Sequence, residues 1–137
     1  MAAKLITPEL IMDQVELIMC CPMIWGKSDC VKTTTQIFKT VTGVDLLKNA
    51  EPYFNLCSAV KLIRKHGGFL RMVETIAAQA KLIECDPCCG AIGISESGLA
   101  SGPDDRALLI CVQPGAWVGK SQNGYTILPK AERCWRV

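Results

Sequence analysis

Apolar side chains recur at three- and four-residue steps through roughly the first sixty per cent of the chain, the spacing of helices that bury one face. This pattern predicts four helices. The first begins at Thr7-Pro8, where a hydroxyl can cap free amides and proline suits the first helical position. The second begins near Ser28-Asp29 and stops at Gly43, which can adopt the left-handed cap conformation. The other two are expected at about residues 53–65 and 69–82.

Short apolar or alternating runs replace the helical period after Cys89, and clusters of Gly, Pro, Asn, Asp and Ser separate them. Such runs predict strands joined by turns. About five of them are expected to form a small antiparallel meander over residues 90–137, with strands at 90–94, 107–113, 116–118, 125–128 and 134–137. The last run closes on Trp135-Arg136-Val137 without a polar tail, which predicts a strand docked in the sheet or against a neighbour.

Helices at about residues 8–82 and strands afterwards predict an α+β domain, because a parallel sheet would need alternating strands and helices. The 137 residues are one domain's length, so we expect a single domain over residues 1–137. The fifteen Lys and Arg against thirteen Asp and Glu leave a net charge of +2, which argues against binding nucleic acid through phosphate neutralisation. Half of the residues are apolar, which suggests partner subunits.

The longest apolar stretch, residues 10–24, is interrupted by Asp13, Glu16 and Pro22, so no membrane span is expected. The first residues show no apolar segment followed by a small-residue cleavage site, which predicts a protein made and kept in a reducing cytosol.

Nine cysteines are an odd number, and in a reducing compartment they are expected to be small buried thiols rather than a disulfide framework. One spacing resembles a metal site: Cys85, Cys88 and Cys89 form a C-x-x-C with an adjacent third thiol. A closed zinc site needs a fourth ligand, which the chain offers only at distant cysteines or at His66. We therefore expect no metal and no cofactor, with these three thiols as the weak alternative.

The turn Trp25-Gly26-Lys27-Ser28-Asp29 delivers Cys30 to the start of the second helix. The unpaired amides and the positive dipole end of a helix favour a thiolate over a thiol, so Cys30 stands where a nucleophilic cysteine could be activated. The alternative is that Cys30 is a packing residue.

A Trp-Gly-x-x-Asp-Cys helix start, further helices and then a small sheet resemble the NlpC-type cell-wall peptidases, which are papain-like cysteine enzymes. The whole chain resembles a reduced subgroup of these proteins that phage genomes encode among their tail-tip genes. The resemblance covers roughly residues 8–137. It rests on residues 24–30, 42–45, 64–68, 107–110 and 134–137.

The departure from the peptidase pattern concerns the base. Peptidases of this type carry a histidine in a strand motif like His-x-Gly-Ile, and the corresponding residues here begin with Ala107. Aligning residues 91–94 instead also places alanine at that position. Alanine cannot take the thiol proton or protonate a leaving amine. His66 is a second candidate base, although a histidine in a His-Gly-Gly helix end is more typical of a cap.

The resemblance implies a structural module of a phage tail tip or baseplate, a papain-like domain that lacks the catalytic histidine and mediates protein–protein contacts. Its partners would be other tail proteins, namely the hub and the central tail-tip or fibre-bearing protein. It would be found in the virion tail and assembled in the host cytoplasm. The alternative is an active cysteine peptidase or amidase that cuts host peptidoglycan during phage entry, with Cys30 attacking and His66 or a group from a neighbouring chain assisting.

Two other sets of residues have structural interpretations. Asp104-Asp105 lies in a Ser-Gly-Pro-Asp-Asp turn, which predicts a solvated loop rather than an acid/base pair. Three aromatic residues on expected strands are assigned to the core or to an interface: Trp117, Tyr125 and Trp135.

Overall fold

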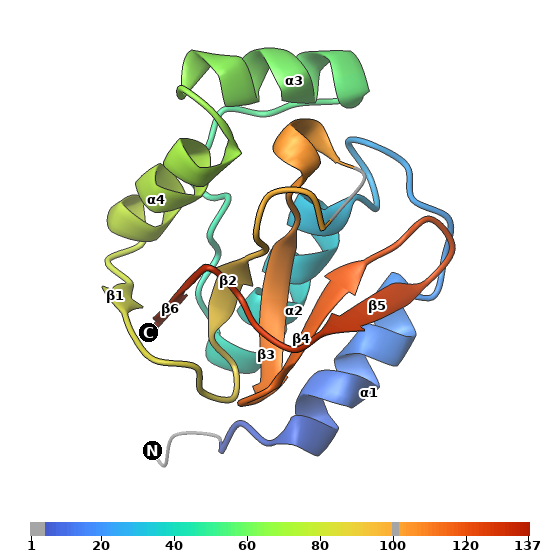
Figure 1. Cartoon of the computed structure of the whole chain (residues 1–137), viewed down its shortest axis with the longest axis vertical. Coiled ribbons are helices and arrows are strands. Elements are labelled where there is room, and N and C mark those ends of the chain that lie inside the picture. Colours follow the sequence, from blue (N-terminus) through green and yellow to red (C-terminus); the bar gives the residue numbers. More distant parts are fainter. Residues whose placement is uncertain (1–4, 100–101) are drawn as a thin grey trace.

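Four helices come first in the chain and a six-stranded antiparallel sheet follows, so the α+β class is confirmed (Figure 1). The computed structural model describes residues 5–99 and 102–137. The helices are α1 (Pro8–Met19), α2 (Cys30–Thr42), α3 (Leu56–Lys65) and α4 (Phe69–Gln79). The strands are β1 (Ile83–Glu84), β2 (Ile92–Ile94), β3 (Leu108–Gln113), β4 (Ala116–Lys120), β5 (Tyr125–Leu128) and β6 (Arg133–Arg136), with a 3₁₀ turn, η1 (Pro103–Asp105), before β3.

The first helix begins, and the second begins and ends, at the residues that the sequence indicates. The Thr7 hydroxyl accepts a hydrogen bond from the Leu10 amide at the start of α1. The Asp29 carboxylate caps α2 in the same way, and Gly43 ends that helix in the left-handed conformation with φ 81°. These signals are local, and their partners lie within a few residues along the chain.

The other two helices are three residues shorter than the sequence predicts. α3 begins at Leu56 because Asn55 and Ser58 form a reciprocal capping box before it. α4 ends at Gln79 in a Schellman motif, in which the Leu82 amide donates to the Ala77 carbonyl. Lys81 occupies the left-handed position of this motif, with φ 58°, where glycine is the usual signal.

The order of the strands is β1-β6-β2-β3-β4-β5, which corrects the expected five-strand meander. Strands β2 to β5 are sequential neighbours, but β6 returns across the sheet and pairs with β2 and β1. Strand β1 was not predicted, because its two residues are too few to show an alternating pattern. The expectation that the C-terminal strand is docked in the sheet is confirmed, since Trp135 lies opposite Ile92 of β2.

The two faces of the sheet are buried by different parts of the chain. One face packs against α1 and α2, where Ile11 and Val15 of α1 join Ile110 and Val118 in a buried cluster. The other face is crossed by the segment between β5 and β6 (Figure 1). On that face a Cβ atom at Gly93 would meet both Trp117 and Ala131 within 2.9 Å, so a glycine is needed beneath the indole ring.

The aromatic residues assigned to the core are largely where the sequence places them. Trp117 is completely buried and Trp135 nearly so. Tyr125 is half-buried, and its hydroxyl donates to the Glu16 carboxylate at 2.6 Å. None of the described helices is long and apolar enough to cross a membrane.

A buried lysine joins the α1–α2 connection to the β4–β5 hairpin. The ammonium group of Lys120 donates to three backbone carbonyl oxygens, those of Cys21, Ser121 and Gly124. Burial lowers the pKa of Lys120, because the charged form loses hydration that only neutral carbonyl dipoles replace. The side chain nevertheless satisfies three acceptors at once, which fixes the loop that leads toward α2.

Replacing this lysine tests the connection. We expect Lys120→Met to reduce the free energy of unfolding by about 1–3 kcal/mol, because three partly buried carbonyl groups lose their donor. Denaturant unfolding measures this change. The exposed Lys48 is the matched control, and Lys48→Met should stay within about 0.5 kcal/mol of the parent. Equal effects of the two substitutions would contradict the assigned role of Lys120.

Candidate functional site

The turn before α2 is built by short hydrogen bonds. The Ser28 hydroxyl accepts from the Ile24 amide at 3.0 Å and donates to the Pro22 carbonyl at 2.8 Å. Gly26 has φ 90°, and a Cβ atom there would lie 2.2 Å from the Phe54 carbonyl oxygen. Glycine is therefore required at this position for two reasons: the positive φ and the close approach of the segment before α3.

The Asp29 carboxylate is fully buried and accepts four hydrogen bonds. Three come from backbone amides, those of Gly26 at 2.8 Å and of Val31 and Lys32 at 2.9 Å. The fourth comes from the Tyr53 hydroxyl at 2.8 Å. The interpretation of Asp29 as an N-terminal helix residue is confirmed, but the sequence did not indicate Tyr53 as its partner.

Tyr53 is held over the helix start from both sides. Its burial and the neighbouring Asp29 charge both raise the pKa of Tyr53, so the phenol stays protonated and donates. The ammonium group of Lys32 lies 4.6 Å from the ring centroid, within the range of a cation–π contact. Tyr53 thereby links the segment before α3 to the first turn of α2.

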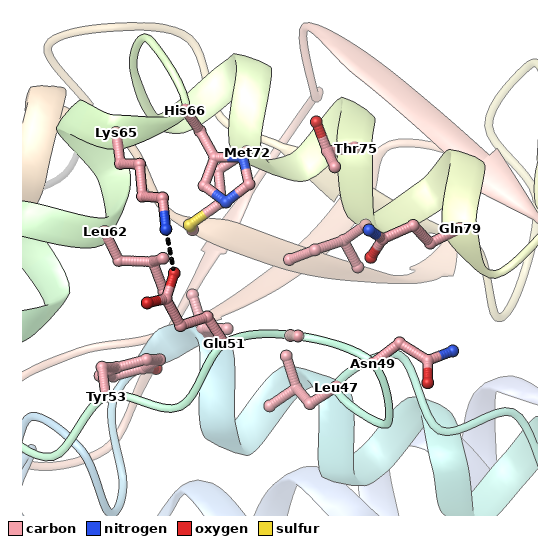
Figure 2. A pocket seen from close by; sticks show the side chains of 13 residues that line it. Leu47, Asn49, Glu51, Tyr53, Leu62, Lys65, His66, Met72, Thr75 and Gln79 are labelled. Atoms are coloured by element: carbon pink, nitrogen blue, oxygen red, sulfur yellow. Dashed lines mark hydrogen bonds and ion pairs between the residues drawn. The ribbon is translucent and has the colours of Figure 1, made fainter.

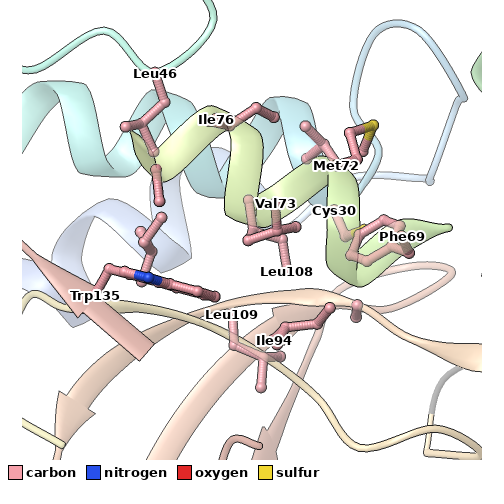
Figure 3. Packing of buried hydrophobic residues seen from close by; sticks show 14 of the residues in the cluster. Cys30, Leu46, Phe69, Met72, Val73, Ile76, Ile94, Leu108, Leu109 and Trp135 are labelled. Carbon is pink, nitrogen blue, oxygen red and sulfur yellow. The ribbon is translucent and has the colours of Figure 1, made fainter. Parts of the chain in front are cut away.

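Cys30 is placed at the start of α2, as predicted, but it is not activated there. Its side chain is 3% exposed and belongs to the buried cluster with Phe69, Met72 and Val73 of α4 (Figure 3). Burial raises the pKa of Cys30 to about 12, and the neighbouring Asp29 carboxylate adds to the rise. The N–H groups of Leu108, Cys30 and Val31 lower the pKa of the thiol, but by less than burial raises it. Desolvation therefore outweighs the helix end and favours the protonated thiol, which agrees with the interpretation of Cys30 as a packing residue.

The strand that faces this thiol carries no base. Leu108, the first residue of β3, lies in the same buried cluster, and its backbone N–H acts on the sulfur. Ala107 precedes it, is buried, and donates its amide to the Ser95 hydroxyl at 2.8 Å. The Thr34 hydroxyl donates to the Leu108 carbonyl at 3.2 Å, which ties α2 to β3 at this level. The position to which the resemblance assigns an imidazole is therefore occupied by a methyl group.

His66 is the residue that caps the end of α3, as its sequence context favours. Its backbone amide donates to the Leu62 carbonyl at 3.2 Å. Within residues 5–99 and 102–137, no hydrogen bond joins His66 to Cys30. His66 is also not among the groups that shift the pKa of the thiol. The structure does not bring the two candidate catalytic residues together.

His66 instead lines a cavity of about 200 Å³ between α2, α3, α4 and the segment before α3 (Figure 2). The apolar walls include Val31, Leu62 and Met72. At the rim the Lys65 ammonium group pairs with the Glu51 carboxylate at 2.9 Å. Cys30 does not line this cavity, so a molecule bound in it would not contact the thiol.

Asp45 and Asp104 both have structural roles. Asp45 accepts from the Leu47 amide at 3.1 Å, which is the turn chemistry that its place after Gly43 predicts. Asp104 is exposed, as expected of a solvated loop, but its carboxylate also accepts from the Phe69 amide at 2.7 Å. It thus caps α4 from 35 residues away, a partner that local sequence patterns cannot reveal.

The three thiols with metal-like spacing lie in the segment between β1 and β2. Cys85, Cys88 and Cys89 are all half-buried. Among the described residues, no three Cys, His, Asp or Glu side chains are arranged to hold a metal ion. All nine cysteines are free thiols in this structure.

The domain is thus an α+β fold whose helix-start cysteine is sealed in the core. The chain belongs to a family described as a domain of unknown function (DUF6950), which it matches over residues 9–137. Comparison with curated proteins and with solved structures finds no match.

The raised pKa of Cys30 predicts an inert thiol. With a pKa of about 12, the thiolate is only about one ten-thousandth of the population at pH 8, and the side chain is also buried. We expect iodoacetamide to label the exposed Cys57 of the native protein long before Cys30, as followed by peptide mass spectrometry. Labelling of both residues at the same rate in the folded chain would contradict this assignment.

The close contact at Gly26 predicts a large cost for a methyl group. We expect Gly26→Ala to reduce the free energy of unfolding by more than about 3 kcal/mol, because strain at positive φ adds to a clash with backbone. Gly43→Ala is the matched control. It has similar strain, with φ 81°, but no atom within 4 Å, and should lose about 1–2 kcal/mol. Equal losses in chemical denaturation would show that the Phe54 contact is unimportant.

Proposed function

We propose that this chain is a non-catalytic structural module of a bacteriophage tail tip or baseplate. It would be a papain-like domain of the NlpC type that has no catalytic base and serves in protein–protein contacts. Its partners would be the tail hub and the central tail-tip or fibre-bearing protein. The proposal rests on the motif resemblance, and one structural observation favours its non-catalytic half: the helix-start thiol is enclosed.

This enclosure has two parts. Phe69, Met72 and Val73 of α4 pack in the cluster that contains Cys30, where a substrate would need to approach. The amide of Phe69 is fixed by Asp104, so the N-terminal end of α4 is held in this position. A buried thiol with a raised pKa and no imidazole lacks both requirements of a cysteine nucleophile, access and deprotonation.

A structural module needs surface that another protein can cover. Large apolar side chains are exposed on two segments that touch each other at Gly26 and Phe54, beside the start of α2. Ile24 is 52% exposed, Phe54 75% and Leu56 48%. In an assembled tail we expect a neighbouring tail protein to bury these side chains, because such exposure is costly in water.

The second candidate function is an active peptidase or amidase on host peptidoglycan. It is favoured by the N–H groups of Leu108 and Cys30, which lower the pKa of the thiol and would stabilise a thiolate if the site opened. Such an enzyme would need α4 to move away and a base to come from His66 or from another chain.

Zymography on purified cell walls distinguishes the two functions. We expect equal and negligible clearing by the parent chain and by Cys30→Ala, because the thiol is enclosed and lacks a base. Clearing by the parent that is lost in Cys30→Ala would instead establish the peptidase. His66→Ala serves as the matched variant. If the parent clears cell walls and His66→Ala does not, His66 is the assisting base.

Phage particles test the structural half of the proposal. We expect mass spectrometry of purified virions to detect this chain among the tail proteins. We also expect Phe54→Asp to abolish its incorporation while leaving the thermal unfolding of the isolated chain unchanged, because Phe54 is exposed. Intact infectious virions without this chain would refute the assignment. Full incorporation of the Phe54→Asp chain would exclude this surface as the contact.

A further inference from the structure

Five of the nine cysteines come together at one corner of the sheet, although only three of them are close in sequence. Cys85, Cys88 and Cys89 lie between β1 and β2, Cys111 lies on β3 and Cys134 on β6. The Gly90 amide donates to the Cys111 carbonyl at 2.9 Å, which holds the β1–β2 segment against β3. The position of β6 between β1 and β2 brings Cys134 to the same corner (Figure 1).

Within this group, Cys85, directly after β1, lies against Cys134 of β6. Glu84, the last residue of β1, is paired with Trp135, so Cys85, which follows β1, comes next to Cys134 of β6. The Cys85 amide donates to the Cys134 carbonyl at 3.1 Å, and the Cys134 thiol donates to the Cys85 carbonyl at 3.0 Å. Residues that face each other on antiparallel strands have Cα atoms about 4.5–5.5 Å apart.

A spacing of this kind falls within the range that a disulfide spans, which is about 4.4–6.8 Å between Cα atoms. The two thiols also interact with each other, and burial together with that contact raises the pKa of Cys85. Cys88 contributes to the same shift, so it is the competing partner. Its backbone is committed to a turn, in which the Ala91 amide donates to the Cys88 carbonyl at 3.1 Å.

We propose that Cys85 and Cys134 are a thiol–disulfide site that small-molecule disulfides of the glutathione type oxidise to a reversible cross-link between β1 and β6. This inference does not depend on the proposed tail function. The link would join residues 49 positions apart and fasten the two-residue edge strand to the C-terminal strand.

The oxidation of Cys85 and Cys134 proceeds in two thiol–disulfide exchange steps. The Cys85 thiolate, half-buried and the more accessible of the two, attacks one sulfur of the small disulfide and expels one thiolate. The Cys134 thiolate then attacks the Cys85 sulfur of this mixed disulfide and expels the second. The two protons released by the cysteines reprotonate the two small thiols. The protein loses two electrons and two protons, and one small disulfide is reduced.

Access to the site depends on β1. Both thiols are protonated at neutral pH in the closed sheet, since burial raises the pKa of each. Attack therefore requires β1 to open, and a two-residue edge strand opens more easily than an internal one. The link should form more slowly than the modification of exposed Cys57.

The native 137-residue chain is incubated with oxidised glutathione and a metal chelator. Its remaining free thiols are then blocked, and its tryptic peptides are mapped without reduction. We expect residues 82–106 linked to residues 134–136, at the mass of the two peptides less two hydrogens. The midpoint of thermal unfolding should rise by at least about 5 °C in the linked protein and return to the original value after reduction.

Single substitutions identify the pair. Cys134→Ser and Cys134→Ala should abolish the link and leave glutathione on Cys85, whereas Cys88→Ser and Cys57→Ser should retain it. Circular dichroism checks that each variant is folded, and the two Cys134 variants guard against loss of folding in either one. A link that survives in the Cys134 variants and disappears in Cys88→Ser would overturn the proposal. So would complete modification of Cys57 with no link at all in the parent chain.

Discussion

The buried carboxylate of Asp29 is the interaction on which the candidate site depends. A charge removed from water costs several kcal/mol unless polar groups replace its hydration. Here three backbone amides and the Tyr53 hydroxyl do so, all at 2.8–2.9 Å. These donors come from the turn before α2, the helix itself and the segment before α3. One side chain therefore fixes the helix start, the Trp25-Gly26 turn and the approach of Phe54 to Gly26.

The same carboxylate explains why a cysteine at a helix start is not activated in this protein. The amides of Val31 and Lys32 are already bonded to Asp29, and its negative charge opposes a second one on the adjacent sulfur. The packing of α4 then removes water from Cys30. A helix end supplies only a modest stabilisation of an anion, whereas full burial of a thiolate can cost several pKa units. Position in the sequence therefore identifies where a nucleophile could stand, and solvation decides whether it is one.

The features that the sequence predicted are those whose causes are local. Thr7, Asp29 and Gly43 act on neighbouring residues, so the start of α1 and both ends of α2 could be inferred from the sequence. Lys81 stands where glycine usually ends a helix, so the sequence predicts an α4 that is three residues too long. Long-range partners could not be inferred: Asp104 caps α4, and β6 pairs with β2 rather than with its sequence neighbour β5. The periods of hydrophobicity identify a strand but not the strand with which it pairs.

The position of β6 makes the C-terminal segment part of the core rather than an appendage. To reach β2, the chain crosses the face of the sheet that carries Trp117, and Ala131 packs there over Gly93. Arg133 then pairs with Glu74 of α4 at 2.8 Å and with Glu84 of β1 at 2.6 Å. These contacts join α4, β1 and β6 at one edge of the sheet, whereas the β4–β5 hairpin at the other edge contacts the α1–α2 connection. The C-terminal segment therefore ties α4 and β1 to the rest of the sheet, which makes it an integral part of the domain.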